Sequence, residues 1–303
     1  MKSPFCKTLE NVPLAKYSSM RTGGSAKFLC LPESVSELAD TVLFYAENDI
    51  KCLVMGNMSN VLVPDEGIDV PVVLTGGVKE YSVLSQDKDG ARIFADCGIS
   101  VTAIALEMCK SGFSGLEFAY GIPGSLGGAV YMNAGAYGGE MSDVTESVYV
   151  LTREHKIIQR SASECNFSYR NSVFETNGDI ILGAVLKLGT GDKDGCVSAA
   201  KELMKKRMEK QPLDFPSCGS TFKRPEGYFA GKLIEDAGLK GFSVGGAAVS
   251  EKHAGFVINK NNASTSDVIA LMRKIQNIVK RNSGVTLESE IRIIDKNGEN
   301  TEL

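Results

Sequence analysis

The sequence has few of the residues from which protein metal sites are built. Among its 303 residues there are only two histidines, His155 and His253, which lie far apart. The eight cysteines are scattered along the chain and form no CxxC pair. Because zinc ligands cluster at short, regular spacings, we expect no metal site.

Long apolar runs and an excess of charge of one sign are missing as well. No stretch approaches 18 continuous apolar residues, and the first ten residues contain no apolar core, so we expect neither a membrane span nor a signal peptide. The 33 Lys and Arg residues nearly balance the 37 Asp and Glu residues, which argues against nucleic-acid binding. Scattered thiols without an export signal predict a cytoplasmic protein, which we expect to be a monomer.

Glycine, in contrast, is abundant. The chain has 32 glycines, about one residue in ten against a usual ~7%. Its 43% of hydrophobic and 23% of charged residues are typical of a globular protein, and its length predicts about two domains.

Helix and strand signals alternate along the chain. Ser34 and Glu37 form a capping box before an apolar face of helical spacing that ends near residue 48. A long helix at 193–210 is predicted to turn Val197, Ala200 and Met204 inward and its cations, Arg207 among them, elsewhere. Further helices are predicted at 100–112, 229–237 and 264–284, and strands at 27–31, 52–55, 72–74, 92–97, 256–259 and 287–293, with short β-like runs over 144–188.

The segment 112–139 differs from its surroundings, with nine glycines in 28 residues. Each interior glycine costs up to ~1 kcal/mol in a regular element, so no regular element is expected there. A flexible linker is one interpretation. The interspersed Leu116, Phe118, Ile122, Leu126 and Val130 favour instead a buried, tightly turned loop whose backbone approaches a ligand.

Two runs of small residues are candidate phosphate-binding loops. Gly56-Asn57-Met58-Ser59-Asn60 follows the apolar strand 52–55, although a plain turn explains it equally well. The second run spans Gly121 to Gly128. The dinucleotide fingerprint GxGxxG is absent at the first loop. Two such loops in one half of the chain fit a dinucleotide such as FAD.

Several charged residues lie among small or apolar ones. Arg170 follows Phe167 and Tyr169, and Lys210, Lys223 and Arg224 surround the small-residue run 217–221, a pattern that suits an anionic substrate. Glu290 lies on the polar face of the strand 287–293. From spacing alone the cations are equally well surface residues, and Glu290 is more simply a solvent-facing carboxylate.

Seven motifs then occur in a characteristic order: TGGSA at 22–26, GNMSNVLV at 56–63, IPGSLGGAVYMNAGAYGGE at 122–140, YRNSVF at 169–174, CGSTFKRP at 218–225, KGFSVGGAAVSEKHAGFVIN at 240–259 and LESEIRII at 287–294. In this combination the chain resembles the UDP-N-acetylenolpyruvoylglucosamine reductase (MurB) family over nearly its whole length.

The resemblance implies an α+β fold. It consists of a two-lobed FAD-binding domain of the vanillyl-alcohol-oxidase/p-cresol-methylhydroxylase type, with lobes at 1–78 and 79–207, and a C-terminal α+β substrate domain at 208–303. In such chains the last strand can return to the first lobe. The helix and strand pattern is compatible with this fold but does not separate it from a doubly wound sheet.

The resemblance also implies ligands and residue roles. FAD is bound non-covalently, and NADPH and UDP-N-acetylglucosamine-enolpyruvate are the substrates. Ser220 matches the proton donor, Arg170 the partner of the substrate carboxylate and Glu290 the second catalytic residue. Lys210, Lys223, Arg224 and Tyr169 are substrate-binding candidates, and the uridine contact is open among Tyr131, Tyr137 and Tyr228. The expected FAD contacts are Gly56, Asn57, Met58, Ser59, Asn60, Val61, Gly121, Ile122, Pro123, Gly124, Ser125, Gly127, Gly128, Asn133, Gly135, Ala136 and Tyr137.

Three alternatives stay open at the level of sequence. Cys218 competes with Ser220 as proton donor, since its thiol is more acidic and the two side chains point the same way if the segment is extended. A different flavoenzyme on this scaffold, an oxidase of a hydroxy acid or sugar, is the first rival function. A nucleotide-sugar-binding module without redox chemistry is the second.

Overall fold

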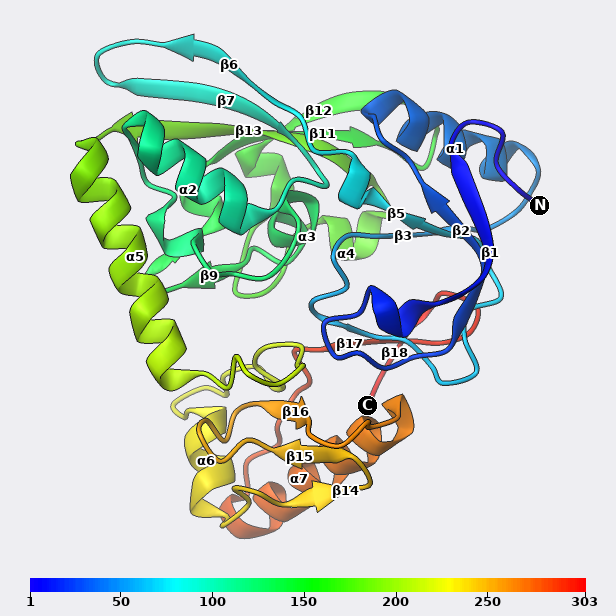
Figure 1. Cartoon of the computed structure of the whole chain (residues 1–303), viewed down its shortest axis with the longest axis vertical. Helices are drawn as coiled ribbons and strands as arrows, with labels where there is room; N and C mark the ends of the chain where they lie inside the picture. The colour runs from blue at the N-terminus through cyan, green and yellow to red at the C-terminus, as the bar shows by residue number, and fades with distance from the viewer. The chain divides into compact units, whose positions relative to one another are not determined.

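The structure is a computed structural model that describes residues 1–303, and the chain divides into two compact units (Figure 1). The first comprises residues 1–8, 30–57 and 73–207, and the second comprises residues 9–29, 58–72 and 208–303. None of the helices is long and apolar enough to cross a membrane.

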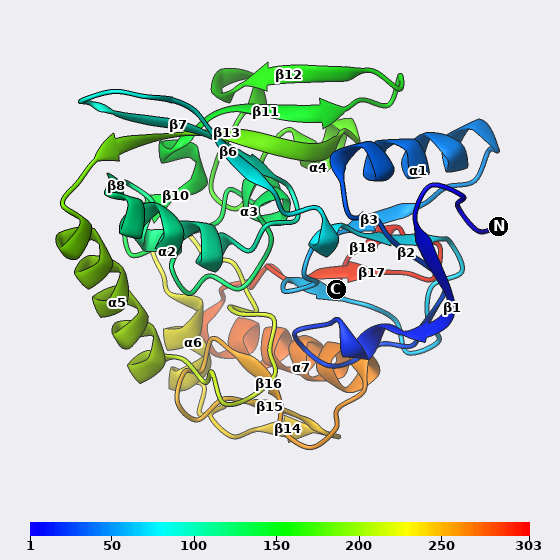
Figure 2. The ribbon, with the colours of Figure 1, turned by 45° about the horizontal axis from the view of Figure 1, so that its top comes forward.

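The first unit is built on an antiparallel sheet. Its strands run in the order β12 (Ile157–Ser161), β11 (Thr145–Leu151), β13 (Ile180–Thr190), β7 (Gly90–Asp96) and β6 (Tyr81–Gln86), and β8 (Phe113–Ser114) pairs with β13. The helices of this unit are α1 (Val35–Glu47), α2 (Val101–Ser111), α3 (Leu126–Tyr131), α4 (Phe174–Asn177) and α5 (Lys193–Lys210). Helices α2 and α3 lie on one face of the sheet (Figure 2).

The predicted helix caps of this unit are confirmed. Ser34 accepts a hydrogen bond from Glu37 N at 3.2 Å and starts α1. Ser100 caps α2 in the same way, and Gly112 ends that helix at a φ of 85°, a conformation that glycine adopts without a steric penalty.

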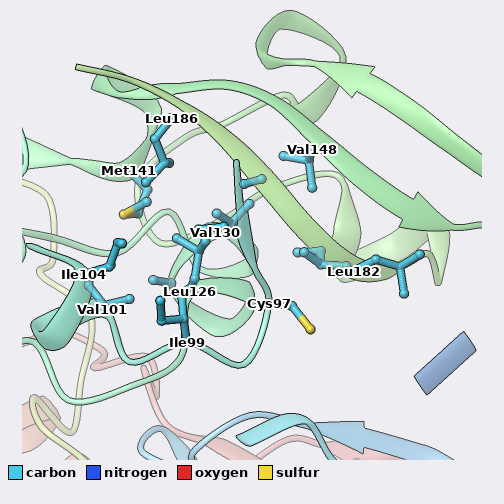
Figure 3. Packing of buried hydrophobic residues seen from close by; sticks show 14 of the residues in the cluster. Cys97, Ile99, Val101, Ile104, Leu126, Val130, Met141, Val148, Leu182 and Leu186 are labelled. Carbon is cyan, nitrogen blue, oxygen red and sulfur yellow. The ribbon is translucent and has the colours of Figure 1, made fainter. Parts of the chain in front are cut away.

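One expectation for the glycine-rich segment is wrong, because part of it is helical. Helix α3 forms in spite of its two glycines. Ser125 caps it, and burial of its apolar side offsets the conformational entropy that the glycines lose in a helix. Figure 3 shows Leu126 and Val130 of α3 beside Leu182 and Leu186 of β13, and all four are at most 1% exposed. The hairpin of β9 (Gly135–Ala136) and β10 (Gly139–Glu140) follows.

The second unit has its own core and two small sheets. One is the antiparallel sheet of β14 (Ser243–Val244), β15 (Ala247–Val249) and β16 (Val257–Asn259), against which α7 (Thr265–Ser283) packs, and α6 (Ala230–Asp236) contacts α7. The other has the order β18 (Asn300–Thr301), β17 (Arg292–Ile294) and β4 (Val61–Leu62), with β17 parallel to β4. The predicted capping box at Ser264 and the stop at Gly284 are both present in α7.

A further four-stranded sheet has the order β1 (Lys7–Pro13), β2 (Ser25–Leu31), β5 (Val72–Leu74) and β3 (Leu53–Met55). The unit boundary falls within β1, β2 and β5. Single 3-10 turns lie at Leu14–Lys16, Thr75–Gly77, Glu117–Ala119, Met141–Asp143 and Ala162–Cys165.

The predicted strand 287–293 is only partly regular. Its first part forms a single bridge, Phe222 to Ser289, and strand β17 begins at Arg292. The reason is a change of partner: Glu290 N bonds to Thr221 O, whereas Arg292 N bonds to Asn60 O.

Candidate active site

In the first unit, the two candidate phosphate-binding loops are in contact. A Cβ atom added to Gly56 would overlap the Oγ of Ser125, so only glycine fits there. Ser125 is 2% exposed and its Oγ accepts from Gly128 N at 3.3 Å, which fixes its position at the start of α3. Gly56 thus packs directly against the residue that caps α3, and glycine-built loops at helix N-termini are typical of sites that bind a phosphate or pyrophosphate.

The second loop is tied to the segment before α2 by its main chain. Gly127 N donates to Cys97 O at 2.7 Å, and a Cβ on Gly127 would lie 2.9 Å from the Cβ of Cys97. Ile122 O accepts from the Thr102 hydroxyl at 3.0 Å, and the same hydroxyl accepts from Gly121 N. These hydrogen bonds and the close packing at Gly127 therefore fix the conformation of the loop.

Asn133, Gly135, Ala136 and Tyr137 lie at the hairpin β9–β10. Asn133 is fully buried, and its side chain bonds to Ser168 O and to Ser142 N. Both polar atoms of the side chain therefore have protein partners, and the backbone N–H of Asn133 donates to Val130 O at 3.1 Å. Tyr137 has a φ of 54° and its side chain is exposed.

Arg170 is joined to the same hairpin. Its guanidinium donates to Gly135 O at 3.1 Å and lies 5.1 Å from the centre of the Tyr169 ring. Hydrogen bonds from Ser142 and Asn133, helped by the charge of Arg170, lower the pKa of Glu140. Arg170 is half-buried. It is thus an oriented cation near a carboxylate rather than a solvated surface residue.

Backbone strain marks the motifs. Among non-glycine residues, positive φ is tolerated best by Asn, Asp and His. The exceptions in this chain are Arg21, Met58, Tyr137 and Arg170, with φ values of 57°, 46°, 54° and 54°. Each lies within or next to one of the seven motifs. Such conformations persist where the surroundings enforce them, which is common at ligand sites.

In the second unit, the segments that carry Ser220 and Glu290 run side by side. Glu290 N donates to Thr221 O at 2.9 Å, and Lys223 N donates to Glu288 O at 2.9 Å. Thr221 is itself fixed, because it is 1% exposed and its hydroxyl accepts from Val257 N at 2.9 Å. Ser220 and Glu290, 70 residues apart in sequence, therefore lie on adjacent, hydrogen-bonded main chain.

The side chains of Cys218 and Ser220 point in different directions. Gly219 between them has a φ of 75°, so the segment is not extended there. Cys218 is 3% exposed, and its Sγ donates to Val61 O at 3.6 Å. Burial raises the pKa of its thiol to about 12. Ser220 is exposed. The structure thus favours Ser220 over Cys218 as the proton donor.

The remaining substrate candidates are less enclosed. Lys210 is exposed at the end of α5, and Tyr169 is 51% exposed. The amine of Lys223 lies 4.0 Å from a carboxylate oxygen of Glu288. Arg224 lies over the ring of Phe229 at 4.0 Å, and its Nε donates to Tyr228 O at 3.4 Å.

The prediction that Arg207 points away from the protein interior is wrong, since this side chain is buried and only 7% exposed. It lies 5.7 Å from the centre of the Tyr137 ring, and a Cβ on Gly121 would lie 3.2 Å from its Cδ. Burial lowers its pKa. The signal was available: Arg207 follows Ala200 by seven residues and Met204 by three, which is the spacing of the inward face.

Comparison with known proteins agrees with this arrangement. A family model described as the C-terminal domain of UDP-N-acetylenolpyruvoylglucosamine reductase matches residues 211–294, and an FAD-binding domain model matches residues 26–160. The reductase of that name from Lachnoclostridium phytofermentans is 44% identical over 94% of this chain and 92% of its own. That from Clostridium novyi is 45% identical over 96% and 93%. The crystal structure of the Thermus caldophilus reductase (MurB) matches with a TM-score of 0.77 at 31% identity, and covers 95% of this chain and 98% of that one.

The fold and the glycine-built loops, together with these matches, define the class: the chain is an FAD-binding oxidoreductase. More narrowly, it belongs to the UDP-N-acetylenolpyruvoylglucosamine reductase family. The resemblance drawn from the seven motifs is thereby confirmed, as are the α+β class with its FAD-binding domain and family-specific C-terminal domain, and FAD as the cofactor.

Proposed function

We propose that this protein uses NADPH to reduce the enolpyruvyl group of UDP-N-acetylglucosamine-enolpyruvate to the lactyl ether, giving UDP-N-acetylmuramate for peptidoglycan synthesis. Family membership over 94% of the chain supports this activity. Among the structural features, the backbone pairing of the segments that carry Ser220 and Glu290 supports the proposal, because two proposed catalytic residues then lie on adjacent main chain.

The residues present fit FAD. At Gly56 and Gly127 a Cβ would collide with Ser125 and Cys97, so both loops are built on bare main chain, which suits N–H contacts to a diphosphate. We propose that residues 56–61 and 121–137 hold the cofactor. When bound, reduced FAD would supply a hydride to the terminal vinyl carbon of the substrate.

The chain's own residues then have distinct tasks. Hydride addition drives negative charge onto the substrate carboxylate, and the guanidinium of Arg170 would stabilise it. Glu290, in its protonated form, would donate a hydrogen bond to the same oxygens. Ser220 would give its proton to the adjacent carbon.

The proposed substrate-binding residues are assigned by the match between their charge and that of the substrate. We propose that Tyr169, Lys210, Lys223 and Arg224 contact the substrate, because the lysines and the arginine suit its diphosphate. Tyr131, Tyr137 and Tyr228 remain the candidates for the uridine, and of these Tyr137 and Tyr228 are exposed at 43% and 48%.

We also propose that lobes at 1–78 and 79–207 bind FAD and that residues 208–303 bind the substrate. A monomer in the cytoplasm fits a chain whose eight cysteines are all unpaired thiols.

The test is anaerobic mixing of the FAD-loaded protein with NADPH and then with the enolpyruvyl sugar nucleotide. Flavin absorbance should bleach and then recover, and the product should be the lactyl ether. Recovery only on admission of O₂ would instead indicate an oxidase. A purified protein that stays colourless after FAD is added would indicate a binding module without redox chemistry.

A further inference from the structure

The peptide units of Glu290 are held from two sides. Its N–H donates to Thr221 O at 2.9 Å, which links it to the residue after Ser220. Its C=O accepts from the side-chain amide of Asn60 at 2.9 Å, which links it to the motif Gly56–Val63. Both bonds lie within the second unit.

Asn60 reaches Glu290 from a fixed main chain. Its own C=O accepts from Arg292 N at 3.0 Å, and the next residue, Val61, pairs with Arg292 in the parallel ladder of β4 and β17. Val61 O in turn accepts from the thiol of Cys218. Asn60 is thus the turn residue directly before β4, and its main chain is tied to Arg292.

This use of the side chain differs from the role expected of the motif. A residue of a cofactor loop normally turns its polar atoms toward the cofactor, whereas the amide donor of Asn60 bonds to the main chain of a proposed catalytic residue. Because the amide of Asn60 donates to Glu290 O, the length of the Asn60 side chain helps to set where that carbonyl lies.

We propose that Asn60 is a positioning residue of the second half-reaction, in which its amide fixes Glu290 beside Ser220. The proposal rests on the function proposed above. A shift of about 1 Å in a group that must meet the reacting atoms can cost about 10²-fold in rate. Removal of the amide donor therefore slows the step that uses Glu290 and spares the step that does not.

The first experiment uses Asn60→Asp in the FAD-loaded protein. The carboxylate has the same shape as the amide but cannot donate, and it repels the carbonyl of Glu290. We expect reoxidation of the flavin by substrate to fall about 10- to 100-fold and reduction by NADPH to fall much less, with both rates taken per bound flavin because the motif that contains Asn60 is also proposed to hold FAD. Asn261→Asp, at an exposed position of the same unit, is the matched control for the added charge.

The second experiment is a double-mutant cycle with Glu290→Gln. If Asn60 acts through Glu290, the double variant should be only slightly slower than Glu290→Gln alone, because the group to be positioned is already impaired. Fully additive losses would overturn the proposal, as would complete loss of FAD or equal slowing of both half-reactions in Asn60→Asp.

Stability is checked with thermal unfolding, and Asn60→Ala serves if Asn60→Asp does not fold. Failure of both variants to fold overturns the proposal as well, because the amide would then be a structural requirement only. Measurements on the wild-type protein distinguish failure of the proposed function from failure of the role proposed for Asn60. If substrate does not reoxidise its flavin, the proposed function fails, whereas a working wild type with additive variants contradicts the role of Asn60 alone.

Discussion

The two glycine-built loops of the first unit, at Gly56 and at 121–128, and the Ser220–Glu290 segments of the second unit are built in opposite ways. In the first, Gly56 and Gly127 let two stretches of main chain approach more closely than any side chain would allow. In the second, Thr221 and Asn60 use side-chain atoms to fix the main chain of their neighbours. The first region depends on the absence of Cβ atoms at its glycines, and the second depends on side-chain atoms that hydrogen-bond to main chain.

This difference suits the task of each region. A cofactor that stays bound through many turnovers is well served by main-chain contacts, which no rotamer change can remove. A proton transfer needs one hydroxyl in one place, which paired segments supply. Added atoms should therefore damage the first region, and removed atoms should damage the second.

The largest effect is expected for Ser220→Ala. Removal of the proposed proton donor should slow flavin reoxidation by substrate by about 10²- to 10⁴-fold and leave reduction by NADPH nearly intact. Stopped-flow absorbance of each half-reaction measures this. Reoxidation at the wild-type rate would assign the proton donor to another group.

A smaller loss is expected for Arg170→Lys. A lysine keeps the charge but cannot reproduce the two-pronged contact of a guanidinium with a carboxylate or its bond to Gly135 O. Turnover should fall about 10- to 100-fold, mostly in kcat. Arg153→Lys, at an exposed position of the same unit, is the control. Unchanged turnover would remove Arg170 from contact with the substrate.

Gly127→Ala adds atoms to the first region instead of removing a functional group. The added methyl group would press against Cys97, 2.9 Å away, and such overpacking costs about 1–3 kcal/mol. We expect weaker FAD binding, measured by the flavin retained after dialysis, together with a lower melting temperature. Gly76→Ala is the matched control, since the nearest atom to its added Cβ is 4.0 Å away. Equal behaviour of the two variants would contradict the argument from close approach.

These two regions were not equally accessible to prediction from the sequence. Caps and apolar spacing are local, and they predicted α1, α2 and α7 within a few residues. The helix α3 was missed because its stability comes from burial of Leu126 and Val130 against β13, which lies more than 50 residues further along the chain. Glycine propensity alone argued against it.

For the site, residue types were visible and their contacts were not. The motif resemblance supplied Ser220, Arg170 and Glu290 as candidates. Nothing in the spacing of Asn60, Thr221 and Glu290 indicated that three distant segments meet. Whether the segment 218–220 is extended was left open by the sequence, and the positive φ of Gly219 shows that it is not.

The smallest effect on flavin reoxidation is expected for Cys218→Ala. Cys218 is buried, its pKa is raised to about 12 and its thiol already donates to Val61 O, so at neutral pH it stays a protonated, enclosed group. Cys218→Ala should therefore leave reoxidation by substrate within about twofold and lower stability by about 1–2 kcal/mol through the lost packing and hydrogen bond. The two stopped-flow half-reactions and thermal unfolding measure this. Since Ser220→Ala removes one oxygen and Cys218→Ala one sulfur from the same short segment, the pair separates chemistry from packing. A loss of reoxidation in Cys218→Ala as large as in Ser220→Ala would mean that the segment acts through its fold and not through the hydroxyl.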